Sequence, residues 1–135
     1  GHHVSPAALR IAIRSRPRDR FMLVTDAMPT VGSATKTFSL QGKTIRANNG
    51  VCMEENGTLA GSDLDMETAL RNAVAMIGLS VDEASFMASG APAAFLGLRD
   101  RGSLIPGQRA DLVWLDAELR LRAVWQAGER VPPAA

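Results

Sequence analysis

The sequence predicts a protein of the α/β class, because strand and helix patterns both recur along its 135 residues. One observation is the continuously apolar run Phe21–Val24, which is typical of a strand buried on both faces. A second is a series of short alternating segments and turns over residues 35–58, which indicates a β-meander. A third is a set of helix-capping signals over residues 63–97. These patterns place strands and helices in one chain.

The first element expected is a helix that begins at Ser5-Pro6. Serine suits the N-cap, and proline suits the first helical position, where no backbone hydrogen bond is lost. Apolar residues at Leu9 and Ile13 follow at helical spacing. The helix is expected to stop before Pro17, because proline disfavours helical geometry in the residue before it.

The strand predicted over Phe21–Val24 leads directly into Thr25-Asp26 and then a loop. In parallel α/β folds, ligands and catalytic groups gather at the carboxyl ends of the strands. A buried parallel strand needs neighbours on both sides, and no other strand–helix–strand unit is apparent in the sequence. We therefore expect the neighbouring strands to lie upstream of residue 1.

The remaining elements follow from local signals. Asn49-Gly50 and Asn56-Gly57 are hairpin turn signals on either side of a short strand. Asp63 or Asp65 is expected to open a helix that Gly78 closes, and Ser80 with Glu83 forms a capping-box pattern for the next one. A short helix is expected at Pro92. Strands are expected over 110–115 and 119–125, followed by a turn at 127–128.

Composition excludes several classes of protein. Fifteen basic and fourteen acidic residues give a net charge of +1, so neither nucleic acid nor a membrane surface is indicated as a partner. A single cysteine cannot form an internal disulfide. No apolar run reaches the roughly 18 residues of a membrane-spanning helix, and no signal peptide opens the chain. The expected compartment is the cytoplasm.

Few residues point to chemistry individually. Asp26 is the strongest candidate: a carboxylate at the mouth of a buried strand would be partly desolvated, which favours a raised pKa and use as a general base. An N-cap or turn aspartate explains the same position equally well. His3 could bind an anion or a metal, although a terminal histidine is more often simply exposed. Cys52 is expected to be a small buried apolar residue.

The order of several motifs is more specific than any one of them. The motifs are Gly1-His2-His3-Val4, Leu23-Val24-Thr25-Asp26-Ala27, Gly42-Lys43-Thr44 and Asn56-Gly57-Thr58-Leu59-Ala60-Gly61-Ser62. In this order they resemble the N-acetylglucosamine-6-phosphate deacetylases. Residues 105–113, followed by Leu115-Asp116, are similar to the closing signature of the wider amidohydrolase superfamily.

The resemblance implies the fold of the C-terminal part of a metal-dependent (β/α)8 barrel, together with part of a small β-sandwich domain. Residues 1–105 would be the barrel part, with a β insertion at about 35–58 and closing helices. Residues 21–26 would be the eighth barrel strand. Residues 106–135 would supply the C-terminal strands of the sandwich.

The resemblance also assigns site residues. Asp26 matches the catalytic aspartate, which takes a proton from a metal-bound water and returns it to the departing amine. The positions matching substrate-binding residues are His3, His2, Gly1, Leu59, Ala60 and Gly61, of which the last three match a loop that closes on the sugar. His2 and His3 beside an N-terminal glycine also fit the remnant of a purification tag.

The implied reaction converts N-acetylglucosamine 6-phosphate to glucosamine 6-phosphate and acetate, and a homodimer is implied for the complete enzyme. The divalent metal expected there, zinc or iron, would be held by residues that have no counterpart in this chain. We therefore expect the chain alone to bind no catalytic metal and to be inactive. Two other interpretations stay open: another amidohydrolase, dihydroorotase-like or dipeptidase-like, or a non-catalytic β-rich binding module.

Overall fold

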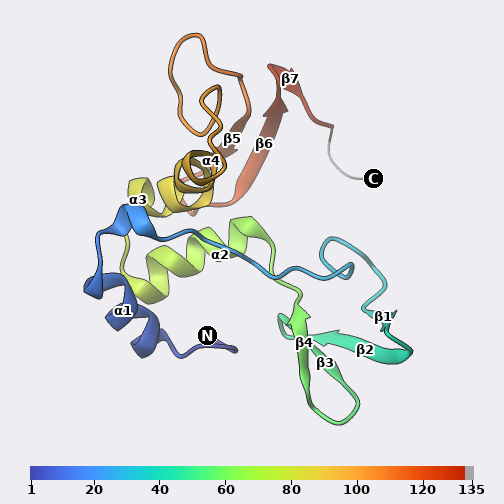
Figure 1. The fold of residues 1–135 in the computed structure, drawn as a ribbon. Helices are drawn as coiled ribbons and strands as arrows, with labels where there is room; N and C mark the ends of the chain where they lie inside the picture. The colour runs from blue at the N-terminus through green and yellow to red at the C-terminus, as the bar shows by residue number, and fades with distance from the viewer. Residues whose placement is uncertain (133–135) are drawn as a thin grey trace.

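A computed structural model of the chain describes residues 1–132 (Figure 1). The helical elements alternate between α-helix and short 3₁₀ or π turns: α1 (Pro6–Ser15), η1 (Arg18–Arg20), α2 (Met66–Asn72), η2 (Ala73–Ile77), α3 (Val81–Ser85), η3 (Phe86–Gly90) and α4 (Ala91–Phe95). The strands are β1 (Thr37–Leu40), β2 (Lys43–Asn48), β3 (Val51–Glu54), β4 (Leu59–Ser62), β5 (Leu112–Leu115), β6 (Leu121–Gln126) and β7 (Glu129–Arg130). The α/β class is confirmed.

The predicted helix ends follow the local signals in the sequence. The Ser5 hydroxyl accepts a hydrogen bond from the Ala8 amide, and α1 ends before Pro17. Asp65, not Asp63, caps α2 through its carboxylate, and Gly78 ends η2 with φ +82°. Ser80 and Glu83 form the capping box. These helix starts are predictable from the sequence because an N-cap bonds an amide only three positions away.

The first sheet is the predicted meander with one strand more than expected. Its order is β1-β2-β3-β4, and each neighbouring pair is antiparallel. The turns at Gln41-Gly42 and Asn49-Gly50 have positive φ at both residues, which is the geometry of tight two-residue hairpins. Val51 pairs with Ser62 and Met53 with Leu59, so β4 lies along β3 with a bulge between the two pairs.

The second sheet is formed by the C-terminal strands in the order β5-β6-β7, again antiparallel. The two strands expected over 110–115 and 119–125 are confirmed as β5 and β6. Figure 1 shows this sheet (red) lying apart from the first one (teal to green), with helices occupying the rest of the structure. Leu115 and Leu119, at the β5–β6 end, pack against the helical core. The second sheet is thereby joined to the helices.

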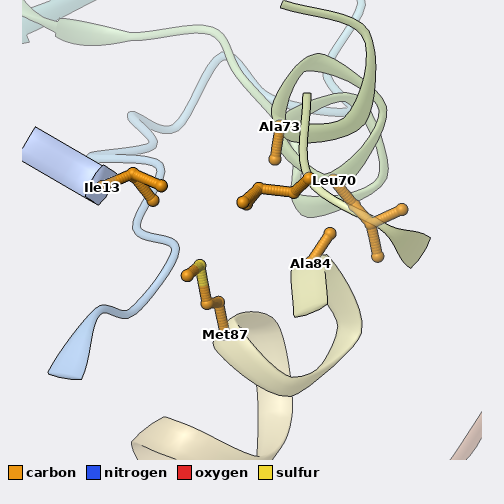
Figure 2. Packing of buried hydrophobic residues seen from close by; sticks show 6 residues of the cluster. Ile13, Leu70, Ala73, Ala84 and Met87 are labelled. Atoms are coloured by element: carbon orange, nitrogen blue, oxygen red, sulfur yellow. The ribbon is translucent and has the colours of Figure 1, made fainter. Parts of the chain in front are cut away.

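The helical core is small and rich in short side chains. Ile13 of α1 meets Leu70, Ala73, Ala84 and Met87 of the following helices, and Figure 2 shows these side chains pointing toward one another. Met87 and Ala84 are almost completely buried, at 1% and 0% exposed. The Arg10 guanidinium donates to the Met76 carbonyl at 2.7 Å, which fixes α1 against η2. Alanine at the contact positions lets the helices approach closely.

The prediction of a buried strand over residues 21–26 is wrong for this structure. The segment carries no strand assignment, Val24 is 78% exposed, and Met22 is 40% exposed. An isolated parallel bridge, between Ala27 and Ser62, follows directly after the segment. The Leu23 amide instead donates to the Met87 carbonyl at 2.9 Å. The apolar run satisfies the strand pattern, but no strand within residues 1–132 lies alongside it.

No helix within residues 1–132 is long and apolar enough to cross a membrane.

Candidate functional site

Asp26 lies at the end of the extended segment, with a positive φ of +52°. That conformation is uncommon for residues other than glycine, although aspartate tolerates it better than most. The residue is exposed, so the expected partial desolvation at a strand mouth is wrong for this structure. The physical reason is sparse strand pairing: within the described part of the chain, β4 meets this end of the segment through its last residue, Ser62, and the Asp26 side chain stays in solvent.

Ser62, the last residue of β4, holds the backbone on both sides of Asp26. Its amide donates to the Asp26 carbonyl at 3.0 Å, and its carbonyl accepts from the Met28 amide at 2.9 Å. Its hydroxyl donates to the Thr25 carbonyl at 2.5 Å. Ser62 itself is 3% exposed. The sequence motif contains this serine, but its contact with a segment 37 positions away could not be inferred from the pattern.

Residues 59–61 were expected to form a loop, and they form strand β4 instead. The strand forms because β3 supplies a hydrogen-bonding partner for it. The short sequence Leu-Ala-Gly-Ser does not alternate between apolar and polar residues, so its pattern does not predict a strand. Gly61 has φ +106° and packs against the site: a methyl group added there would lie 2.7 Å from Met28 Cγ and 3.2 Å from the Asp26 carbonyl oxygen. Glycine is therefore required by both conformation and space.

The N-terminal residues named by the resemblance are exposed, and one of them, His2, lies near the first sheet. A methyl group added at Gly50 would lie 3.9 Å from Nε2 of His2, and one added at Gly1 would lie 3.0 Å from Met76 Cε. The Gly50 carbonyl accepts from the Asp63 amide at 3.1 Å, beside Ser62. His2 is thus brought to the β2–β3 turn, next to the end of β4. His3 follows it and is exposed.

A charged pair closes the loop that follows Asp26, and sequence reasoning missed it. The Lys36 ammonium donates to the Asp63 carboxylate and to the Thr30 carbonyl, both at 2.8 Å. This hydrogen bond from Lys36 holds the pKa of Asp63 below its ordinary value. The other carboxylate oxygen, Oδ1, is buried, and the neighbouring Thr30 hydroxyl contributes to the same lowering of the pKa. A lysine and an aspartate 27 positions apart carry no signal of pairing in a single sequence.

Cys52 is buried, as predicted, and lies in β3 at 0% exposed. Its sulfur is 3.6 Å from the Thr30 hydroxyl, and Thr30 is 1% exposed. Because Thr30 also accepts from Lys36, these contacts fix the 27–35 loop to the sheet. The cysteine is therefore part of the packing beneath the loop.

Metal ligation has no support in residues 1–132. No group of three or more histidine, cysteine, aspartate or glutamate side chains lies close enough there to hold a metal ion. The described residues therefore do not supply a ligand set for a catalytic metal.

One hollow lies between the helices and the second sheet, and Asp26 does not line it. It measures about 1150 Å³ and is bounded by the helices of residues 81–96 and by β5 and β6, with Trp114 and Trp125 among its lining residues. None of the predicted site residues lines it. The hollow therefore gives no support to the sequence-based site, which depends on the contacts around Asp26.

Comparison with known proteins defines the class. The Amidohydrolase family matches residues 7–131, and the chain belongs to this family. An N-acetylgalactosamine-6-phosphate deacetylase from Escherichia coli O157:H7 is 39% identical over 130 residues, and an N-acetylglucosamine-6-phosphate deacetylase from Bos taurus is 39% identical over 133 residues. The alignments cover 96% and 97% of this chain. The resemblance to this group of deacetylases is confirmed.

A solved structure agrees with these relatives. The N-acetylglucosamine-6-phosphate deacetylase of Pasteurella multocida superposes with a TM-score of 0.91 at 29% identity, over 97% of this chain and 35% of that one. The chain spans only 34% and 32% of the two relatives named above. A shorter relative from Escherichia coli K12, provisionally named an N-acetylgalactosamine-6-phosphate deacetylase, is 39% identical to this chain. The alignment covers 77% of that relative.

Proposed function

We propose that the chain is the C-terminal part of an amidohydrolase that removes the acetyl group from N-acetylglucosamine 6-phosphate. The observation that carries this proposal is the match of nearly the whole chain to deacetylases of amino-sugar 6-phosphates. A Mycobacterium smegmatis deacetylase described as a complex with N-acetyl-D-glucosamine-6-phosphate supports it, at 38% identity and a TM-score of 0.84 over 95% of this chain. The products would be glucosamine 6-phosphate and acetate.

N-acetylgalactosamine 6-phosphate is the second candidate substrate. Relatives named for that substrate, from Escherichia coli O157:H7 and a Shewanella strain, are 39% and 40% identical to this chain. The two sugars differ in the configuration at a single carbon, so the same acetamide chemistry serves both. A direct comparison of kcat/KM for the two substrates decides between them.

Asp26 is proposed as the general base and acid. Its carboxylate would accept a proton from the attacking water as the C–O bond forms at the acetamide carbonyl. It would then return that proton to the nitrogen as the C–N bond breaks, so that the amine leaves neutral. Exposure of Asp26 in this chain leaves its side chain accessible to substrate. The sugar contacts are assigned to His3, His2 and Gly1, and to Leu59–Gly61 at β4.

Residues 1–105 are proposed as the end of a (β/α)8 barrel and residues 106–135 as strands of a small β-sandwich. Exposed apolar side chains support this assignment: Val24 is 78% exposed, and Trp114 and Val113 on β5 are 59% and 64% exposed. Large exposed apolar patches mark surfaces that contact other protein. The whole enzyme is proposed to be a homodimer in the cytoplasm.

The test is acetate release from N-acetylglucosamine 6-phosphate by the complete gene product. Asp26→Asn keeps the shape of the side chain but removes the base, so kcat is expected to fall by about 100-fold or more. Asp19→Asn is the matched control, because Asp19 is also an exposed aspartate but lies in η1. Full activity of the Asp26 variant would remove its assigned role. Absence of acetate from the unsubstituted enzyme would contradict the substrate, leaving another amidohydrolase or a binding module.

A further inference from the structure

Ser62 is placed to control the direction of the Asp26 side chain, and the reason lies in peptide geometry. A peptide unit is planar, so a hydrogen bond to one carbonyl oxygen orients the whole unit. The Ser62 hydroxyl binds the carbonyl of the unit that precedes the Asp26 Cα, and the Ser62 amide binds the carbonyl of the unit that follows it. Both planes that meet at this Cα are therefore held by one residue.

The backbone at Asp26 needs such support. Its φ of +52° lies in the left-handed region, where a side chain crowds the backbone. A residue in that region stays there only when its surroundings determine the conformation. The Ser62 carbonyl adds a third contact by accepting from the Met28 amide, two residues beyond Asp26.

Ser62 is itself fixed. It is 3% exposed, it pairs with Val51 across the first sheet, and its hydroxyl also accepts from the Leu64 amide at 3.2 Å. The hydrogen bonds from Ser62 to the Asp26 segment are therefore made by a residue fixed in β4 and not by a mobile surface side chain. Any residue except proline can supply the two backbone contacts, whereas the contact with Thr25 requires a side-chain donor, here the hydroxyl. The hydroxyl is the part that mutation can isolate.

We propose that Ser62 is a positioning residue for the reaction, holding Asp26 in its catalytic orientation through the hydroxyl bond to the Thr25 carbonyl. This inference rests on the proposed deacetylase function and on the role of Asp26. Ser62 does not touch the substrate in this scheme. Its removal changes the rate at which the proton is transferred, because misplacement of a catalytic group weakens the transition state more than the bound substrate.

The test uses the complete gene product and the variants Ser62→Ala, Ser62→Thr and Ser89→Ala. Ser89→Ala is the matched control, because its hydroxyl donates to the Ser85 carbonyl at 2.8 Å in a helix far along the chain from Asp26. Ser62→Ala is expected to lower kcat by about 10- to 100-fold and to change KM by less than about 2-fold. Ser62→Thr, which retains the hydroxyl, is expected to restore most of kcat.

Hydrogen exchange of the Met28 amide supplies a readout that is independent of turnover. Exchange is expected to be faster in Ser62→Ala, because loss of the hydroxyl bond to Thr25 lets the 25–28 backbone open more often although the Met28–Ser62 backbone bond remains, and unchanged in Ser89→Ala. If kcat of Ser62→Ala equals that of the unsubstituted enzyme, the positioning role is overturned, whatever the exchange shows. Equal loss of kcat in the two alanine variants overturns it as well. An unsubstituted enzyme that releases no acetate overturns the proposed function, and the positioning role with it. Failure of the positioning role alone is recognised by acetate release from the unsubstituted enzyme together with an unchanged kcat in Ser62→Ala.

Discussion

Gly61→Ala tests whether the close packing of β4 against the Asp26 segment is what the site requires. The new methyl group would lie 2.7 Å from Met28 Cγ, 3.0 Å from Met28 Cε and 3.2 Å from the Asp26 carbonyl oxygen. The methionine side chain can turn away, because it has three rotatable bonds. The carbonyl oxygen belongs to the backbone and accepts from Ser62, so it can move only if that hydrogen bond changes.

The magnitude follows from two separate costs. A non-glycine residue in the left-handed region costs about 1–2 kcal/mol. Overpacking by one methyl group costs about 1–3 kcal/mol in a well-packed site. Gly57→Ala is the matched control, since Gly57 has φ +86° and its added methyl group would meet nothing within 4 Å. We expect Gly61→Ala to lower the free energy of unfolding by about 2–5 kcal/mol and Gly57→Ala by about 1–2 kcal/mol.

Urea unfolding of the complete gene product measures both costs, and acetate release measures the effect on the site. Adding Met28→Ala to Gly61→Ala removes the flexible neighbour but leaves the contact with the Asp26 carbonyl. We therefore expect part of the stability to return while kcat stays low. Equal stability losses in the two glycine variants would refute the argument, because they would show that space around Gly61 is not limiting. So would full recovery of kcat in the double variant.

Two further predictions concern the charged pair and the helical core. Lys36→Met is expected to cost about 1–3 kcal/mol at pH 7 by removing the hydrogen bond that lowers the pKa of Asp63. That stabilisation is present above the ordinary pKa of 3.8 and lost as the pH falls through the lower folded value. The stability gap between variant and parent should therefore narrow below about pH 3.8 to the part that comes from the Thr30 contact, and a gap that stays constant with pH would contradict this. Met87→Ala, which empties a buried site, is expected to lower the free energy of unfolding by about 2–5 kcal/mol. Met66→Ala is the control, because Met66 is 40% exposed, and it is expected to lower it by less than about 1 kcal/mol. Urea unfolding measures both.

Elements whose signals are local were predictable from the sequence. Ser5, Asp65 and Ser80 cap helices as expected, because each cap satisfies amides only three residues away. The turn at Asn49-Gly50 was likewise specified by two residues that accept a positive φ. The meander followed, since hairpin turns of fixed length also fix the register of the strands they join.

Elements that depend on distant partners were not predictable in the same way. An apolar run such as Phe21–Val24 indicates only that its side chains favour burial, and it does not indicate which partner buries them. Within the described residues, no strand lies beside this run. Leu59–Ser62 has the opposite character, since its sequence gives a poor strand pattern and β3 nevertheless pairs with it. In both cases the outcome was decided by the available partner and not by the segment itself.

The same distinction applies to Asp26, whose identity has a local signal and whose surroundings do not. The order of motifs selected the residue, but the expected desolvation followed from an assumed strand mouth, and the residue is exposed. What the structure adds is the origin of its backbone geometry in β4, which lies 33–36 positions downstream. A change in the register of β3 and β4 would carry Ser62 away from Thr25 and turn the carboxylate with it. The meander is therefore coupled to the chemistry, although it supplies no reacting group itself.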